Sequence, residues 1–182
     1  SHAAHVATRA PLAPDEHEFF TPDPLVVPFT WIPDDARIEQ LDDGDLRGAP
    51  GTQVQRDGDV LRCIIPGGLG MLPTPEGLSL TFHASGRLAS QRFYEHGCLR
   101  WSIEYHASGG RESIGMWVDR ERFEHREQGQ HTRFAPNGTI IAQAYWEAGT
   151  RVGWTKLWED DGYPIGATRY VEGAAVEQRL PR

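Results

Sequence analysis

Histidine is the residue type in this chain with the widest chemical range, since it can ligate a metal or transfer a proton. The sequence has eight histidines, and no two have the His-x-x-x-His spacing of zinc-binding helices. His83 and His106 occupy the same place in two copies of a repeated phrase, whereas Ala135 and Glu159 stand there in the other two copies. This variation favours an exposed strand end over a metal or catalytic site. We therefore expect no bound metal.

Cys63 and Cys98 are the only cysteines, and they do not form a Cys-x-x-Cys pair. Both stand in apolar, strand-like surroundings, where a free cysteine behaves as a small hydrophobic residue. A disulfide between them remains an alternative that requires an oxidising compartment. The glycine-rich Pro66–Gly70 resembles a phosphate-binding loop, but no Lys-Ser/Thr follows it. The sequence shows no catalytic motif, so we expect a protein that is not an enzyme and has no cofactor.

A short phrase recurs four times in the chain. It consists of an aromatic residue, two variable residues, a small polar residue and glycine, and its copies are Phe82–Gly86, Tyr105–Gly109, Phe134–Gly138 and Trp158–Gly162. The aromatic residues recur every 23 to 29 positions. Self-similarity at such a period is typical of repeat architectures, in which each unit is one supersecondary element.

Each repeat has the pattern of a β-hairpin. Ser-Gly, Asn-Gly and Asp-Gly indicate turns that need positive φ, and a second turn follows at Glu95–Gly97 and Glu147–Gly149. Between turns, the residues Cys98 to Tyr105 alternate between polar and apolar, which indicates a strand with one buried face. We predict an all-β fold, an antiparallel β-hairpin repeat meander that forms a single twisted sheet. The predicted turn glycines are Gly86, Gly97, Gly109, Gly138, Gly149 and Gly162.

The chain divides into four segments. The first is extended or irregular, because five prolines between Pro11 and Pro28 oppose a helix running through it. A hairpin with an Asp-Gly turn follows and caps the first repeat, and a Gly/Pro linker precedes the repeats. The charged stretch Asp119–Gly129 is interpreted as a long solvated hairpin loop. The predicted boundaries are 1–50 for the acidic N-terminal segment, 51–76 for the capping hairpin and linker, 77–173 for the repeats and 174–182 for a C-terminal tail.

The negative charge is concentrated in the first part of the chain. The net charge is −8, and residues 1–76 carry 13 acidic and 5 basic residues, whereas residues 77–182 are balanced. Such a field disfavours nucleic acid and anionic lipid and favours a cationic partner. The alternative is a solvated loop that only aids solubility. The candidate partner-binding acids are Asp34, Asp35, Glu39, Asp42, Asp43 and Asp45.

Aromatic residues are the second candidate for partner binding. Tyr145 and Trp146 are adjacent, and Phe93 and Tyr94 are too, so each pair points to opposite faces of a strand. At least one aromatic of each pair is then off the inner face. Exposed aromatics beside arginines are typical of protein-binding hot spots. Candidate contact residues are Tyr94, Trp146, Arg122 and Arg126.

Phe134–Gly138, and Tyr145–Gly149 followed by Gly153 and Trp154, resemble the repeats of the MORN-repeat variant family, in particular the YwqK-like bacterial antitoxins. The resemblance covers about residues 77–173. It implies a non-catalytic antitoxin or immunity protein that neutralises a toxin, such as a secreted nuclease-type effector of a bacterial secretion system, by binding and occluding it. The alternative function is a MORN-type scaffold or an envelope or membrane tether.

The expected partner is therefore a cationic protein toxin. We expect no nucleic-acid partner and no membrane insertion, since no apolar stretch approaches the length of a membrane span. A homodimer through an open sheet edge is a further alternative. The expected compartment is the bacterial cytoplasm, with the periplasm as the alternative if an N-terminal signal has been removed.

Overall fold

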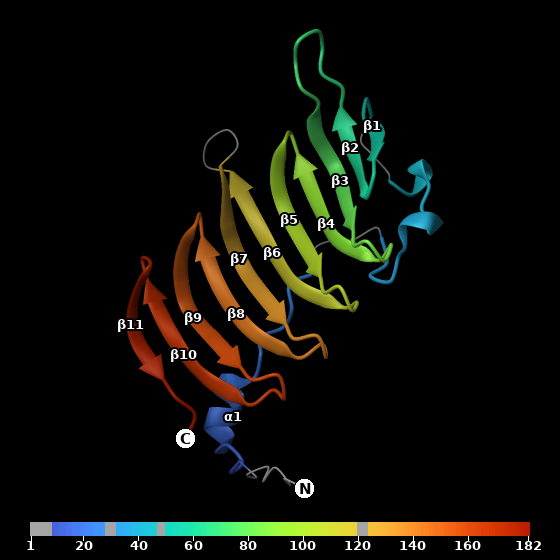
Figure 1. The fold of residues 1–182 in the computed structure, drawn as a ribbon. Helices are drawn as coiled ribbons and strands as arrows, with labels where there is room; N and C mark the ends of the chain where they lie inside the picture. The colour runs from blue at the N-terminus through green and yellow to red at the C-terminus, as the bar shows by residue number, and fades with distance from the viewer. Residues whose placement is uncertain (1–8, 28–31, 47–49, 120–123) are drawn as a thin grey trace, which may run out of the picture.

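Eleven antiparallel strands form one sheet whose spatial order follows the sequence (Figure 1). The computed structural model describes residues 9–27, 32–46, 50–119 and 124–182. This architecture confirms the all-β hairpin meander. The strands are β1 (Gln53–Asp57), β2 (Val60–Ile65), β3 (Thr74–Phe82), β4 (Leu88–Glu95), β5 (Cys98–Tyr105), β6 (Arg111–Asp119), β7 (His125–Phe134), β8 (Ile140–Glu147), β9 (Thr150–Trp158), β10 (Pro164–Val171) and β11 (Ala174–Arg179).

Two kinds of turn join the strands, one kind at each end of the strands. In the aromatic phrase, the glycine N–H bonds back to the residue three positions earlier, as in Gly86 N to His83 O at 2.8 Å. At the opposite ends of the strands, His96 and Gly97 have φ values of 52° and 81°, the conformation of a two-residue hairpin turn. All six predicted turn glycines have positive φ, which glycine adopts without a Cβ clash.

The repeated histidines hold neighbouring hairpins together. Nε2 of His83 lies 3.1 Å from the carbonyl oxygen of Tyr105, and Nε2 of His106 lies 2.9 Å from that of Phe134. Since a carbonyl only accepts, each Nε2 carries the proton. Each ring therefore ties the turn of one repeat to the aromatic residue that begins the next turn. This arrangement gives the two histidines a role in the repeat stack.

The strands extend beyond the predicted repeat boundaries. Residues 174–179, predicted as a tail, form β11, because Glu172 and Gly173 (φ 48° and 82°) make one more hairpin turn of the His96–Gly97 kind. The predicted loop Asp119–Gly129 is wrong at both ends, since β6 runs to Asp119 and β7 begins at His125. Cross-strand pairs such as Trp117 with Glu127 continue the ladder through this charged region.

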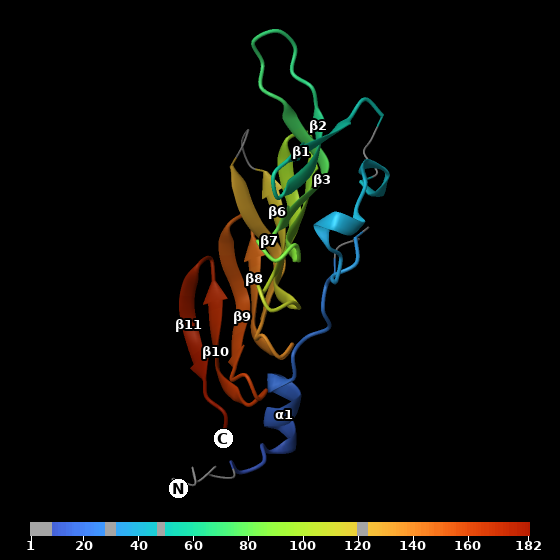
Figure 2. The same cartoon turned by 45° about the vertical axis from the view of Figure 1, so that its right-hand side comes forward.

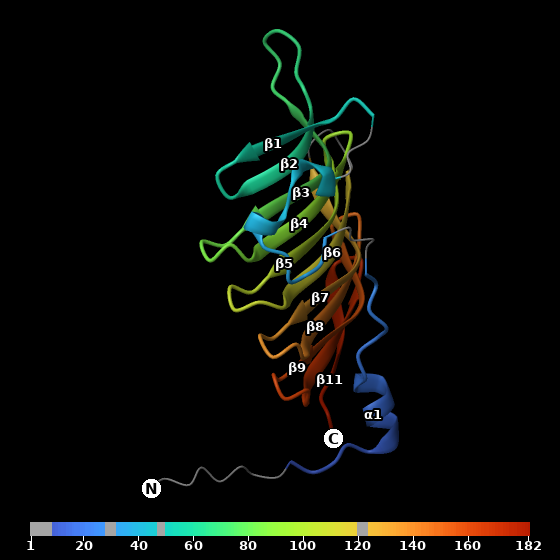
Figure 3. The same cartoon turned by 90° about the vertical axis from the view of Figure 1, so that its right-hand side faces the viewer.

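The N-terminal residues cross one face of the sheet from its last strands to its first. Figures 2 and 3 show this crossing segment, residues 9–27 and 32–46, running from α1 (Pro14–Phe20) beside β9–β11 to the short helices η1 (Ile38–Gln40) and η2 (Asp43–Asp45). We call this side of the sheet the covered face and the other side the open face.

The helix α1 lies where the sequence predicted an extended lead. Proline is accepted in the first helical turn, which is where Pro14 stands, and Asp15 and Glu16 complement the positive helix end. The helix stops at Thr21, before Pro22. The prolines therefore limit the helix to seven residues.

The hydrophobic core lies on the covered face. Leu61, Leu80 and Ile103 are fully buried there, and the crossing segment contributes Ile32 and Leu46, each 3% exposed. The core is thickest over β2–β6 and uses the crossing segment as its second layer. A single sheet needs such a layer, because one of its faces is apolar.

Candidate functional site

Buried glutamines hold the crossing segment on the covered face. The side-chain amide of Gln143 accepts from Asp23 N at 2.8 Å and donates to Asp23 O at 3.1 Å. Gln130 accepts from Val26 N and donates to Pro24 O in the same way. The Gln91 amide donates to Ile32 O at 2.8 Å. These side chains satisfy main-chain groups of a segment that has little β-pairing of its own.

Two acidic residues of the crossing segment complete this attachment. Asp23 accepts from Tyr145 Oη at 2.5 Å and lies 3.6 Å from Lys156 Nζ. Asp34 accepts from Tyr105 Oη at 2.6 Å and from Arg111 Nε at 2.8 Å. Part of the N-terminal negative charge is therefore neutralised within the molecule.

The other candidate acids lie on the surface near β1–β4, and most have local partners. Arg37 hydrogen-bonds Glu39 at 2.6 Å and so lowers the pKa of that exposed carboxyl. Asp42 and Asp45 form the capping box of η2, and Asp43 lies 3.9 Å from Arg56. Asp35 is exposed and, with Asp34, lines a hollow of about 380 Å³ beside the turn between β5 and β6. Contact between these acids and a partner stays a prediction.

The open face carries a row of large side chains, one from each of five successive strands. They are Trp117 of β6, His131 of β7, Trp146 of β8, Arg151 of β9 and Tyr170 of β10. The ring centroids of Trp117 and His131 lie 5.2 Å apart, and those of His131 and Trp146 lie 6.4 Å apart. The Arg151 guanidinium lies 4.7 Å from the Trp146 ring and 5.0 Å from the Tyr170 ring.

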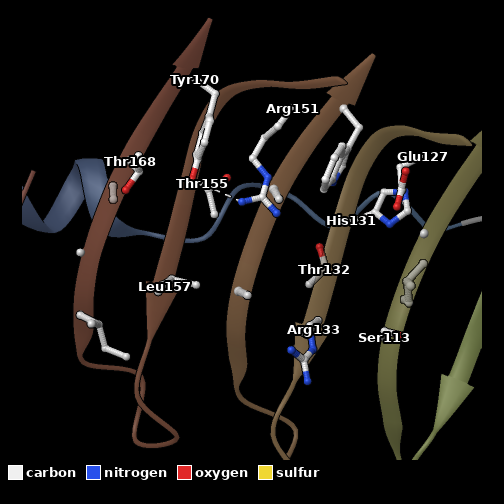
Figure 4. A pocket seen from close by; sticks show the side chains of 18 of the residues that line it. Ser113, Glu127, His131, Thr132, Arg133, Arg151, Thr155, Leu157, Thr168 and Tyr170 are labelled. Atoms are coloured by element: carbon white, nitrogen blue, oxygen red, sulfur yellow. Dashed lines mark hydrogen bonds between the residues drawn. The ribbon is translucent and has the colours of Figure 1, made fainter. Parts of the chain in front are cut away.

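This aromatic row forms one wall of a groove of about 590 Å³ (Figure 4). Small residues make its floor, among them Ala142, Ala144 and Thr155, and Arg133 and Leu157 lie farther along. In Figure 4 the crossing segment passes behind the sheet, on the side away from the groove. The hydroxyl of Thr155 is buried and has no hydrogen-bond partner among the described residues. The groove thus combines aromatic surface with donors and acceptors that the chain itself leaves unused.

His131 is fixed as part of the wall. Its Nε2 lies 2.8 Å from the carbonyl oxygen of Met116, so this nitrogen carries the proton. Burial lowers the pKa of the ring, which favours neutral imidazole. The ring lies close against Gly115, where a Cβ would come within 2.5 Å of His131 Cε1. The His131 ring therefore leaves no room for a side chain at position 115, which explains why glycine stands there.

The predicted aromatic and basic candidates do not gather at one place. Trp146 lies in the groove and Tyr145 points to the covered face, so the two neighbours point to opposite faces, as predicted. Tyr94 lies on the open face beside Arg92, outside the groove. Arg126 pairs with Glu124 at 2.8 Å. Arg122 lies outside the described residues.

Sequence reasoning missed the other members of the row, namely Trp117, His131, Arg151 and Tyr170, as a group. A signal existed, because each stands on the same side of its strand once the hairpin register is drawn. Bulges between Ile114 and Met116 and between Arg169 and Tyr170 shift this alternation, so the pattern is broken in a single-sequence count.

The cysteines do not join this site. Both are free, Cys63 in the core and Cys98 half-buried with its Sγ donating to Asp119. Burial raises the pKa of Cys63, and the Asp119 hydrogen bond raises that of Cys98, so both favour the unreactive thiol. Within residues 9–27, 32–46, 50–119 and 124–182, no group of three His, Cys, Asp or Glu is placed to hold a metal. No helix in the same ranges could span a bilayer.

Comparison with models of known protein families finds no match to this chain. A search of curated proteins also finds no relative. The function is therefore argued from the two faces of the sheet.

Proposed function

We propose that this chain is a non-catalytic protein-binding module of the antitoxin or immunity type, whose partner covers the open face of the sheet. One observation supports the proposal above the others. The molecule covers one face with its own N-terminal residues, whereas the opposite face keeps a groove lined by Trp117, Trp146, Arg151 and Tyr170. Tryptophan, tyrosine and arginine are the residues that dominate binding energy in protein interfaces.

The state of the groove residues favours binding over catalysis. His131 is neutral, and its proton is held by a backbone carbonyl. Arg151 is stacked between two rings. These groups offer shape, π surface and hydrogen-bond donors, which is what an occluding interface uses.

The acidic stretch acts in this proposal by steering. It belongs to the crossing segment on the covered face and does not line the groove, so its contribution is a long-range field that speeds the approach of a cationic toxin. Replacing Asp35 and Asp43 with lysine is expected to slow association and reduce its salt dependence, while dissociation stays unchanged. Asp42 and Asp45 are left intact, because they cap η2. An unchanged association rate would remove steering from the proposal.

The proposal is tested by co-expression with the products of neighbouring genes. A cognate toxin arrests growth when it is expressed alone and is silent when paired with this chain. Trp146→Ala and Tyr170→Ala are expected to restore toxicity at equal expression, whereas Tyr94→Ala, an open-face aromatic outside the groove, keeps protection. Protection that survives both Trp146→Ala and Tyr170→Ala would contradict the role of the groove.

A second candidate, an envelope or membrane tether, is favoured by one loop. Between β2 and β3 the chain projects beyond the end of the sheet (Figure 1), and Leu69, Met71 and Leu72 there are 109%, 74% and 88% exposed. Flotation with anionic liposomes tests this function. Flotation that is lost in Leu69→Ser/Leu72→Ser would favour the tether, and absence of flotation favours the antitoxin.

A further inference from the structure

The arginines of the described residues divide into paired and unpaired sets. Nine of them form ion pairs with Asp or Glu, and Arg62 and Arg87 donate to neutral oxygens. The arginines of those ranges that lack a carboxylate partner are Arg62, Arg87, Arg182, Arg133 and Arg151, and the last two share one surface. Both line the groove on the open face.

Arg151 is positioned by two aromatic rings. Its guanidinium lies between the Trp146 and Tyr170 rings, which fix its plane. Its hydrogen bond to Tyr170 Oη is long, at 3.4 Å, and its Nε is buried without a hydrogen-bond partner. A guanidinium fixed by stacking loses little entropy when it binds a carboxylate through two parallel hydrogen bonds.

The rest of the groove fits an extended chain. The floor of Ala142, Ala144 and Thr155 carries only small side chains, so a backbone can lie close to the sheet. Glu127 is the one acidic residue among the lining residues, and it lies near His131 at the Trp117 end. Attraction for an anion is therefore strongest toward β9 and β10.

We propose that the groove binds an extended, carboxylate-bearing segment of the partner protein, with Arg151 as the principal anchor and Arg133 as a second cation. This inference rests on the proposed function and names the chemistry that the open face recognises. Charge complementarity supports this occupant, since neither arginine of the groove has a carboxylate partner among the described residues and Glu127 is the one acid that lines it.

The test uses the full chain and short peptides of alternating glutamate and threonine, with glutamine–threonine and lysine–threonine peptides as matched probes. Indole N–H resonances report the site, because Trp117 and Trp146 line the groove, whereas the Trp158 indole donates to Phe20 O on the covered face. We expect the glutamate peptide to shift the Trp117 and Trp146 signals and leave Trp158 unchanged. Equal binding of the lysine peptide, or no shift with the glutamate peptide, would overturn the proposal.

Further measurements separate the other occupants. Free glutamate at matched carboxylate concentration is expected to give no shift, and an equal shift would replace the segment by a small carboxylate ligand. Shifts that grow with protein concentration alone would show a second copy of this chain in the groove, which also overturns the proposal.

Variants locate the anchor. Arg151→Gln is expected to weaken glutamate-peptide binding roughly tenfold or more, and Arg151→Lys recovers only part of it, because ammonium lacks the bidentate geometry. The control is Arg169→Gln, whose arginine is already paired with Glu177 at 2.9 Å. Loss in the control equal to that in Arg151→Gln would refute the anchor role. Toxin neutralisation without glutamate-peptide binding would refute this inference alone, and peptide binding without neutralisation would refute the antitoxin role alone.

Discussion

The two faces of this sheet use polar side chains in opposite ways. On the covered face, Gln130 and Gln143 bond to the main chain of the crossing segment, and Asp23 and Asp34 are held by tyrosine and cationic side chains. On the open face, Arg151 Nε and Thr155 Oγ1 are buried without hydrogen-bond partners among the described residues. The covered face also has two such atoms, Gln91 Oε1 and Glu16 Oε2, but both side chains bond between the crossing segment and the sheet through their other polar atom. Buried polar groups without partners are costly. The comparison indicates that one face is built for stability and the other keeps its groups for an external ligand.

The largest effect on this comparison is expected from Gln143→Leu. Gln143 is 0% exposed and bonds to both main-chain groups of Asp23. Leucine fills similar space but leaves both partly buried groups without their partner, so we expect a loss of about 2 kcal/mol or more in the free energy of unfolding. Urea denaturation measures this loss.

The matched control for that experiment is Gln178→Leu, because Gln178 is exposed and lines the groove on the open face. Its free energy of unfolding is expected to change by no more than about 0.5 kcal/mol. If both variants lost equal stability, the proposed division of labour between the two faces would be wrong.

The next effect concerns Tyr105→Phe. Burial raises the pKa of Tyr105, and so does its hydrogen bond to Asp34. The substitution removes two hydrogen bonds, one donated to the Asp34 carboxylate and one accepted from Gln91, so we expect a loss of about 2 kcal/mol at neutral pH. The phenol is neutral when folded and ionises near pH 10 when unfolded, so its contribution is present below about pH 10 and is lost as the pH rises above that.

Unfolding measured at about pH 8 and about pH 11 checks this expectation. The Phe variant should show a shallower alkaline decline in stability than the parent chain. Parallel pH profiles for the two proteins would show that Tyr105 is not the group responsible.

A smaller effect on stability is expected from Arg151→Gln. The guanidinium contributes two ring contacts, each worth about 0.5 to 1 kcal/mol at a partly exposed site, and removing it also removes a buried Nε without a partner. The net change in unfolding free energy should stay below about 1 kcal/mol. A larger loss by thermal or urea unfolding would place Arg151 among the structural residues.

The smallest effect concerns His131 in acid. Burial lowers its pKa, although Glu127 and the Met116 carbonyl oppose this. The folded state then binds the proton less readily than the unfolded state, so the contribution of His131 is present above about pH 6.5 and is lost as the pH falls. His131→Asn should flatten the acid limb of the stability profile relative to the parent chain. An unchanged acid limb would contradict this assignment.

The repeat architecture could be predicted because its signals are local. Glycines with fixed spacing and period-two strands identified the meander, and the adjacency of Tyr145 and Trp146 separated the two faces. The turn before β11, Val171-Glu-Gly173, resembles Glu147-Ala-Gly149 and could also have been read. Strand extension beyond 173 was therefore within reach of the same reasoning.

The crossing segment could not be predicted, because its contacts join residues far apart in sequence. Asp23 meets Gln143 across 120 positions and Val26 meets Gln130 across 104, and nothing in a glutamine marks it as a ligand for a particular main-chain amide. The groove could not be predicted from the sequence for a related reason. Its wall needs five strands in register, and single-residue bulges shift the register where it matters.

The crossing segment also has a consequence for biosynthesis. Hairpin arrays of this kind assemble from neighbour to neighbour as they leave the ribosome. Here Phe19 packs at 5.0 Å against Trp154, and Glu16 pairs with Arg179, so an early-made stretch docks on residues translated as many as 163 positions later. Residues 32–46 can cover β2–β6 as soon as those strands form, whereas the part of the covered face that α1 contacts stays bare until β9 and β11 are made. During this interval the exposed apolar surface favours aggregation.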